Sequence, residues 1–169
     1  MPCIVVTPLA ELNVALARWT PSHVLSIQSP PGTAPTLDIG HQQSVTFHDV
    51  VDETVPVAGL VRPAEEHAEW IVRFAREWGG DHPLLIHCRF GVSRSPAAAL
   101  IALAVREPNA AAWELLARLR AAASFVTPNR RLLEAADRSL GRTDLAAAAK
   151  RAGRGTETST GTAFAVDCA

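Results

Sequence analysis

Residues 87–96 read His-Cys-Arg-Phe-Gly-Val-Ser-Arg-Ser-Pro and lie between two apolar runs. The run before them, Pro83 to Ile86, has the length and bulky aliphatic side chains of a buried strand, whereas the alanine- and leucine-rich run from Ala97 to Val105 predicts a buried helix. The residues between therefore form a strand-to-helix turn. Unpaired N–H groups and the positive end of the helix dipole suit an anion there. The same field favours the reactive thiolate form of Cys88.

Strands and helices alternate along the rest of the chain. Apolar patterning predicts strands over residues 3–6, 22–27, 44–49 and 83–87, and helices over 8–19, 63–78, 97–105, 109–123 and 128–140. This alternation indicates an α/β fold: a single domain whose central, mostly parallel sheet is flanked by helices. We assign the domain to residues 1–141. Residues 142–169 are expected to form a flexible C-terminal tail, because the segment from residue 153 is rich in Gly and Thr.

Composition narrows the class of protein. The chain has 169 residues, is 48% hydrophobic and carries a net charge of -1, so we expect no nucleic-acid partner. No apolar stretch has the length of a membrane span, and the N-terminus lacks the features of a signal peptide. These features favour a cytoplasmic monomer without membrane contact.

Cysteine usage agrees with a reducing compartment. Three cysteines are too few and too scattered for a disulfide framework. Cys3 is expected in the core of the first strand, and a protective disulfide between Cys3 and Cys88 is left open. Cys168 is expected to be exposed on the tail.

The turn after residue 87 contains what the cleavage of a phosphate monoester needs, which is a nucleophile and groups that hold the phosphate oxygens. Cys88 is the candidate nucleophile, and the planar guanidinium of Arg94 matches two phosphate oxygens. Ser95 is placed to donate a hydrogen bond to the sulfur. Gly91 permits a tight turn close to a ligand. The remaining oxygens are expected to bind the loop formed by Arg89, Phe90, Gly91, Val92, Ser93 and Arg94.

His87 directly precedes the nucleophile in the predicted strand. Side chains alternate between the two faces of a strand, so the imidazole points away from the side chain of Cys88. We therefore interpret His87 as an orienting hydrogen-bond donor and not as the base.

The pattern His-Cys-x-x-Gly-x-x-Arg-Ser in this context resembles the signature of the cysteine-dependent protein tyrosine phosphatases, in particular their compact, dual-specificity-like members, including small bacterial ones. The resemblance implies hydrolysis through a cysteinyl-phosphate without metal or cofactor. It makes Cys88 the nucleophile, Arg94 the phosphate-binding arginine and Ser95 the loop hydroxyl. It also gives a supporting role to Asn129, because Pro128-Asn129 resembles a pair that follows the signature in these enzymes. The expected partner is a phosphorylated protein or a small phosphomonoester.

The sequence identifies the general acid less clearly than it identifies the nucleophile and the loop around it. Asp49 lies at the end of the third predicted strand, where the resemblance places the acid of compact members. Asp52 lies on the connection that follows and is the alternative.

Two other classes of protein remain open. A rhodanese-like sulfurtransferase also places a cysteine in an anion-binding loop between a strand and a helix, but it needs no general acid. A non-catalytic phospho-binding module would use the same loop without turnover. The glycine at the third position after the cysteine and the Arg-Ser pair at the sixth and seventh favour the phosphatase.

Overall fold

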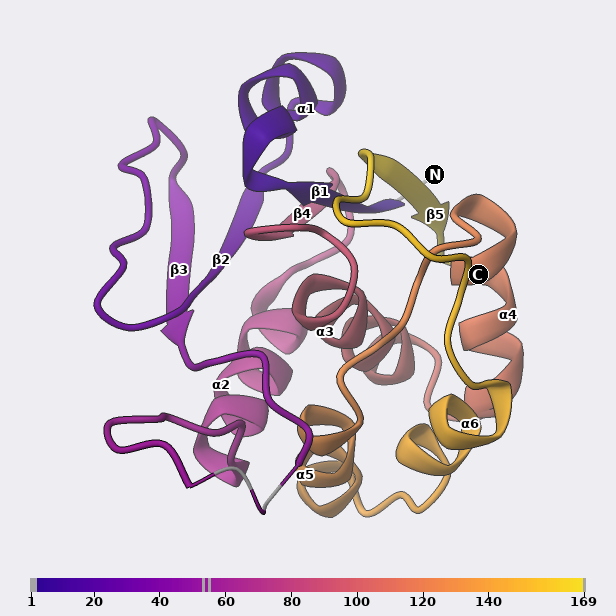
Figure 1. Cartoon of the computed structure of the whole chain (residues 1–169). Helices are drawn as coiled ribbons and strands as arrows, with labels where there is room; N and C mark the ends of the chain where they lie inside the picture. Colours follow the sequence, from indigo (N-terminus) through magenta and orange to yellow (C-terminus); the bar gives the residue numbers. More distant parts are fainter. Residues whose placement is uncertain (1–2, 53, 55, 169) are drawn as a thin grey trace.

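The computed structural model describes residues 3–52, 54 and 56–168, which form a five-stranded sheet with helices on both faces (Figure 1). The strand order is β3-β2-β4-β1-β5. The strands are β1 (Cys3–Pro8), β2 (His23–Gln28), β3 (His41–Thr46), β4 (Leu84–Cys88) and β5 (Phe164–Asp167). The first four run parallel, and β5 pairs antiparallel with β1. The predicted single α/β domain with a mostly parallel sheet is confirmed.

A short 3-10 helix (Leu9–Glu11) and six α-helices complete the described fold. The α-helices are α1 (Leu12–Trp19), α2 (Glu65–Glu77), α3 (Arg94–Arg106), α4 (Ala112–Ala122), α5 (Arg130–Leu140) and α6 (Leu145–Ala152). Helix α1 covers one face of the sheet, and the later helices gather on the other around α3 (Figure 1). None of the described helices has the length and apolar character required to cross a bilayer.

Helix α3 is the centre of this arrangement. Every residue from Arg94 to Ala104 is buried. Its many alanines lack bulk, so the sheet, α2, α4 and α5 can all approach the helix closely. The N-terminus of α3 is thereby fixed directly after the end of β4.

The two central strands end together. Cys88, the last residue of β4, lies opposite Pro8, the last residue of β1. The loop that follows Cys88 therefore begins at the carboxyl edge of the sheet. Ligands of parallel α/β sheets bind at this edge.

The segment from residue 142 onward is part of the fold, and the prediction of a flexible tail is wrong for it. Phe164 and Val166 turn inward from β5, and the Phe164 ring packs edge-on against Phe125 at 5.9 Å between ring centroids. Strand β5 covers the edge of β1 that would otherwise remain unpaired. Four residues among glycines and threonines carry too little apolar pattern to reveal this strand.

Two expectations about cysteines also change. Cys168 is only 4% exposed, and burial raises the pKa of its thiol to about 11, so it is not the exposed thiol predicted for the tail. Cys3 lies five residues before Pro8, which pairs with Cys88. This separation is roughly 16 Å along a strand, well beyond the ~7 Å between Cα atoms that a disulfide bridges. The two thiols cannot pair in this fold.

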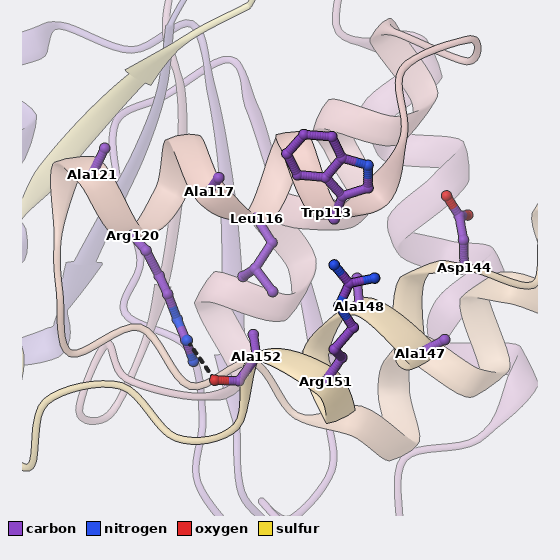
Figure 2. Close-up of a pocket in the computed structure, with 10 residues that line it drawn as sticks. All are labelled: Trp113, Leu116, Ala117, Arg120, Ala121, Asp144, Ala147, Ala148, Arg151 and Ala152. Carbon is purple, nitrogen blue, oxygen red and sulfur yellow. Dashed lines mark hydrogen bonds between the residues drawn. The ribbon is translucent and has the colours of Figure 1, made fainter.

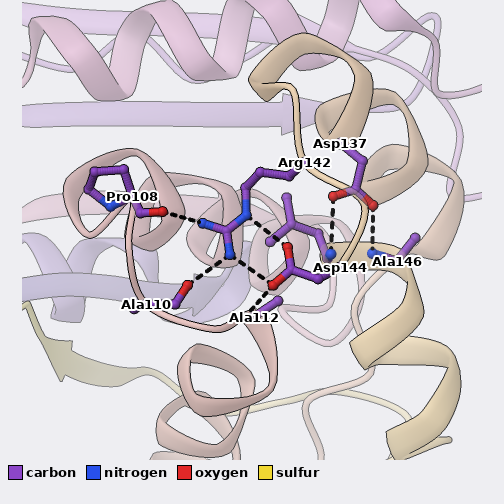
Figure 3. Close-up of polar contacts among 8 residues, drawn as sticks. Pro108, Ala110, Ala112, Asp137, Arg142, Asp144 and Ala146 are labelled. Carbon is purple, nitrogen blue, oxygen red and sulfur yellow. Dashed lines mark hydrogen bonds and ion pairs between the residues drawn. The ribbon is translucent and has the colours of Figure 1, made fainter.

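An arginine ties the connection between α5 and α6 to the start of α4 (Figure 3). Nε and Nη2 of Arg142 donate to the two carboxylate oxygens of Asp144 at 2.8 and 2.9 Å. Nη1 and Nη2 also donate to the carbonyls of Pro108 (3.1 Å) and Ala110 (2.8 Å). All three guanidinium nitrogens are therefore paired within the protein.

Carboxylates beside this arginine accept from two helix starts (Figure 3). Asp144 accepts from the backbone N–H of Ala112 at 2.8 Å, the first residue of α4. Asp137 accepts from the N–H groups of Leu145 and Ala146, the first two residues of α6, at 3.0 and 3.1 Å. These contacts satisfy N–H groups that a helix start leaves unpaired, so this cluster joins three helices.

Candidate active site

The loop after β4 curls tightly around the sulfur of Cys88. Gly91 has a φ of +68°, and a Cβ atom there would lie 2.8 Å from the backbone nitrogen of Pro8. Only glycine combines this conformation with that close approach. In this position the N–H of Gly91 donates to Sγ of Cys88 at 3.3 Å.

The loop's carbonyl groups are held from outside. The carbonyls of Arg89, Phe90, Val92 and Ser93 accept from the N–H groups of Leu9 (3.3 Å), Gly161 (2.8 Å), Thr127 (3.0 Å) and Asn129 (3.2 Å), respectively. Among the described residues, none accepts a hydrogen bond from the backbone N–H of Phe90, Val92, Ser93 or Arg94. A loop with its carbonyls bound behind and its N–H groups unpaired offers a cradle for an anion.

The sulfur lies inside this cradle. Cys88 is only 3% exposed, and its Sγ lies 3.1 Å from Oγ of the fully buried Ser95. With the N–H of Gly91, the sulfur has two hydrogen-bond partners from the loop. Donors directed at a sulfur stabilise its negative charge. The structure therefore brings Ser95 to the sulfur of Cys88 as expected from the sequence, and adds the N–H of Gly91, for which the sequence predicted only a role in the turn.

Arg94 is buried to 4% exposure at the start of α3. Its Nη1 donates to Oγ of Ser29 at 2.8 Å and to the carbonyl of Phe47 at 2.9 Å. Its Nε, although buried, has no hydrogen-bond partner among the described residues. Buried polar groups are nearly always paired, so this nitrogen is a donor available to an acceptor from outside the described chain.

Asp49 reaches the loop from the connection after β3. Its Oδ1 accepts from Oγ of Ser93 and from Nδ2 of Asn129, both at 2.7 Å. Its Oδ2 has no described partner, and the side chain is exposed. One oxygen of the carboxyl group is thus fixed at the rim of the loop while the other faces solvent.

The two ends of the Asn129 amide have different roles, which cannot be distinguished from the sequence. Its Oδ1 accepts from the N–H of Leu132 at 3.0 Å and so caps α5. Its Nδ2 donates to Asp49 and, at 3.3 Å, to the carbonyl of Val50. The cap fixes the amide, and the amide fixes the carboxyl group.

Asp52 is turned into its own loop. It accepts from the backbone N–H of Thr54 at 2.8 Å and from the Thr54 hydroxyl at 2.7 Å. The bond from this N–H, followed by the one from the hydroxyl, lowers the pKa of Asp52 below its ordinary value. Both of these hydrogen bonds keep the carboxyl group of Asp52 within its own connection, whereas Asp49 is the carboxylate that contacts the Cys88 loop.

His87 points away from the sulfur, toward β2. Its Nε2 lies 2.7 Å from Oγ of Ser26, its register partner on that strand, and the ring is fully buried. Burial lowers the pKa of His87 to about 4, so the ring is neutral at pH 7. Its hydrogen bond positions β4 against β2, and Nδ1 has no hydrogen-bond partner in the described part of the chain.

Sequence reasoning did not find the groups that hold Arg94 and His87. Ser29 and the carbonyl of Phe47 come from the connections after β2 and β3, and Ser26 comes from β2 itself. Ser29 lies in a Ser-Pro-Pro-Gly turn, which predicts only a turn. Its role appears only when β2 and β4 are placed side by side.

No protein-family model and no characterised protein sequence matches the chain. Solved structures match over most of its length. The structure of DUSP15 superposes with a TM-score of 0.62 at 17% identity, covering 89% of this chain and 92% of that one. The chain has the dual-specificity phosphatase fold. Human DUSP28 (TM-score 0.57, 18% identity) covers 83% of this chain and 94% of its own. PTPMT1 in complex with PI(5)P (TM-score 0.55, 15% identity) covers 89% and 94%.

Within this dual-specificity phosphatase fold, the mouth of the loop has two sides. On one side, Arg89 and Phe90 are exposed, with the guanidinium carbon 5.5 Å from the ring centroid and the ring 48% exposed. On the other side, Asp49, Ser93 and Asn129 open into a groove of about 730 Å³. A substrate bound in the loop would meet an aromatic face on one side and a polar groove on the other.

Proposed function

We propose that this protein hydrolyses phosphomonoesters as the cysteine-dependent protein tyrosine and dual-specificity phosphatases do. The observation that carries the proposal is the anion cradle around Cys88, in which the buried Arg94 has an unpaired Nε. The fold comparison supports the same reaction. The carboxyl group of Asp49 at the rim supplies a proton donor, which a sulfurtransferase does not need.

In the first step, the thiolate of Cys88 attacks phosphorus and the bond to the leaving oxygen breaks. The loop N–H groups and Arg94 hold the three other phosphate oxygens, where charge is stabilised in the transition state. Asp49 transfers its proton to the leaving oxygen. The products of this step are the free alcohol or phenol and a cysteinyl-phosphate.

In the second step, water attacks the phosphorus of the cysteinyl-phosphate. Asp49, now ionised, accepts the proton from that water, and the bond between phosphorus and sulfur breaks. Ser95, at 3.1 Å from Sγ, is placed to stabilise the departing thiolate. The reaction returns inorganic phosphate and the starting thiolate, with no metal or cofactor in either step.

The test is turnover of p-nitrophenyl phosphate by the purified protein, with acid quenching to trap a phosphoenzyme. We expect turnover that vanishes in Cys88→Ser, persists in EDTA and is inhibited by vanadate. Full activity in Cys88→Ser would disprove the mechanism. Transfer of sulfur from thiosulfate to cyanide, without phosphatase activity, would identify a sulfurtransferase. Phosphopeptide binding without turnover would identify a binding module.

We infer that the substrate is a phosphorylated protein or a small phosphomonoester and that the protein acts as a cytoplasmic monomer. The loop itself carries no lysine, and besides Arg94 its only cation is Arg89. Because one structure of this fold contains PI(5)P, the substrate panel includes a phosphoinositide beside phosphotyrosine, phosphoserine and nucleotide substrates. Turnover confined to the phosphoinositide would contradict the inference.

A further inference from the structure

The groove beside Asp49 has a rigid outer wall. The wall is the segment 153–158, where the chain leaves α6. The N–H groups of Gly155 and Thr156 donate to Oγ1 of Thr127 and to the carbonyl of Ser124, both at 2.9 Å. A Cβ atom on Gly155 would collide with the backbone of Ser124 and Phe125, so the wall depends on glycine at this position.

Arg120 holds the same segment, 153–158, through hydrogen bonds to its start. Its Nη1 donates to the carbonyl of Ala152 at 2.9 Å, and its Nη2 donates to the carbonyl of Gly153. Its Nε donates to the carbonyl of Val126 at 3.1 Å. The end of α6 and the segment before α5 are therefore bound to one guanidinium. The groove is held open by fixed backbone on both sides.

Three cations line this groove: Arg130 at the start of α5, Lys150 in the last turn of α6, and Arg154 just beyond it. All three are exposed, and no described residue forms a hydrogen bond or ion pair with their side chains. Among the described residues, two carboxylates, Asp49 and Glu157, line the groove with them. The chain as a whole has a net charge of -1, so this excess of positive charge is local.

Arg130 stands where helix electrostatics disfavour it. It is the first residue of α5, and the positive end of a helix dipole prefers acidic side chains. No acidic residue occupies the first turn of α5. The residue before Arg130 is Asn129, whose amide holds the proposed acid. An anion bound at Arg130 would therefore relieve an unfavourable charge directly beside the catalytic carboxyl group.

We propose that this groove binds a second anionic group, a phosphate or a carboxylate, on the phosphopeptide whose first phosphate occupies the Cys88 loop. The assignment rests on the proposed function, since it makes the groove part of the substrate site. A peptide fits better than a lipid because most of the residues that line the groove have polar or charged side chains. The threonines and glycines of the wall offer hydrogen bonds to an extended chain, whereas acyl chains need an apolar surface.

Binding to the Cys88→Ser protein tests the proposal without requiring turnover. The probes are a fluorescent peptide with one phosphotyrosine and the same peptide with a second phosphate on a neighbouring serine, tried at each adjacent position in turn. We expect the second phosphate to tighten binding about 10-fold at its best position, because it would be attracted by three exposed cations at once. The gain should shrink as salt is added.

Two variants locate the effect. Exchange of Arg130, Lys150 and Arg154 for Gln should remove the difference between the two peptides. The control is Arg151→Gln, because Arg151 is also a cation at the end of α6 but lines the separate groove between α4 and α6 (Figure 2). The control should keep the full difference.

The possible results distinguish a failure of the proposed subsite from a failure of the proposed hydrolysis. Equal binding of both peptides, or a difference that survives the triple exchange, would overturn the subsite even if the wild type turns over p-nitrophenyl phosphate. A difference that depends on the three cations, in a protein without turnover, would leave the subsite standing and refute the proposed hydrolysis. Binding only to vesicles that contain a phosphoinositide would assign the groove to a lipid and overturn the peptide.

Discussion

Two arginines of this protein are both largely withdrawn from solvent, yet they differ in what surrounds them. All three nitrogens of Arg142 donate to Asp144 or to backbone carbonyls. Arg94 has only Nη1 paired to described residues, and its buried Nε has no partner there. Every nitrogen of the Arg142 guanidinium has a hydrogen-bond partner within the protein, whereas Nε of Arg94 has none among the described residues.

The difference separates a structural region from a candidate functional one. Burying an unpaired donor costs about 1–3 kcal/mol, so a fold that needed Arg94 only for stability would supply an acceptor. The loop at the carboxyl edge of the sheet instead leaves Arg94 and several N–H groups open on the same side. The unpaired Nε of Arg94, together with the unpaired N–H groups of the same loop, supports the proposed anion site.

The largest expected effect falls on Arg94. Replacing it with Ala should lower kcat/KM by about 10³-fold, because the bidentate contact to the transition state is lost. Arg94→Lys should recover only part of this, since a point charge cannot replace the planar fork. Steady-state kinetics with p-nitrophenyl phosphate measure both. Full recovery by Lys would show that charge alone is needed and that the open Nε has no special role.

The second-largest effect is expected at Asp49, the proposed general acid. Asp49→Asn should lower kcat/KM about 10²-fold on an alkyl or phenyl phosphate with a poor leaving group, because the leaving oxygen is no longer protonated. The loss should be much smaller for p-nitrophenol, which leaves without a proton. Asp52→Asn is the matched control and should stay near wild type. The reverse pattern, with Asp52→Asn inactive, would move the acid to the neighbouring loop.

Arg142 should give the opposite result from Arg94. Arg142→Ala removes four hydrogen bonds and leaves Asp144 without its counterion, so the free energy of unfolding should fall by about 1–3 kcal/mol. Urea denaturation measures this loss. Activity per folded molecule should remain close to wild type at a temperature where both proteins are folded. A variant as stable as wild type but inactive would erase the distinction between the two arginines.

The smallest expected effect is a pH dependence from His87. Burial lowers its pKa to about 4, below the roughly 6.5 of an unfolded chain. Between these values the unfolded chain binds a proton that the folded chain does not. Stability should therefore fall by about 1–2 kcal/mol from pH 7 to pH 5.

Replacing His87 with Gln keeps a side-chain donor for Ser26 but removes the titrating ring. Urea midpoints for this variant should be flatter over the same pH range. The carboxylate of Asp144, whose pKa is lowered mainly by its hydrogen bond from Arg142, contributes stability that is lost only at lower pH. An unchanged pH slope in His87→Gln would assign the loss to other groups.

Contiguous features of this site were predictable from the sequence, and contacts between distant segments were not. Cys88, Gly91 and Arg94 follow from one run of residues because strand, turn and helix are neighbours along the chain. Ser29 lies 65 residues from the arginine that it holds, and no local pattern reports on such a contact. The double role of Asn129 depends in the same way on the distant Asp49.

Strand β5 shows the same limit for the fold. The parallel sheet could be predicted because β1, β2 and β4 are apolar enough to produce a pattern, whereas the mostly polar β3 (residues 41–46) was predicted three residues too late, over 44–49. Residues 164–167 become a strand only because β1 offers an unpaired edge. The stability of β5 comes from its pairing with β1, so the sequence of residues 164–167 alone gives little indication of a strand.

The N–H of Gly161 holds the carbonyl of Phe90 in the phosphate loop. During synthesis, β4 and the whole Cys88 loop leave the ribosome long before residue 161. In a nascent chain, the loop around Cys88 therefore still lacks the hydrogen bond from Gly161. This contact can form only after the segment around residue 161 has emerged. The segment around residue 161 is made after the Cys88 loop and completes the hydrogen bonds that hold its carbonyl groups.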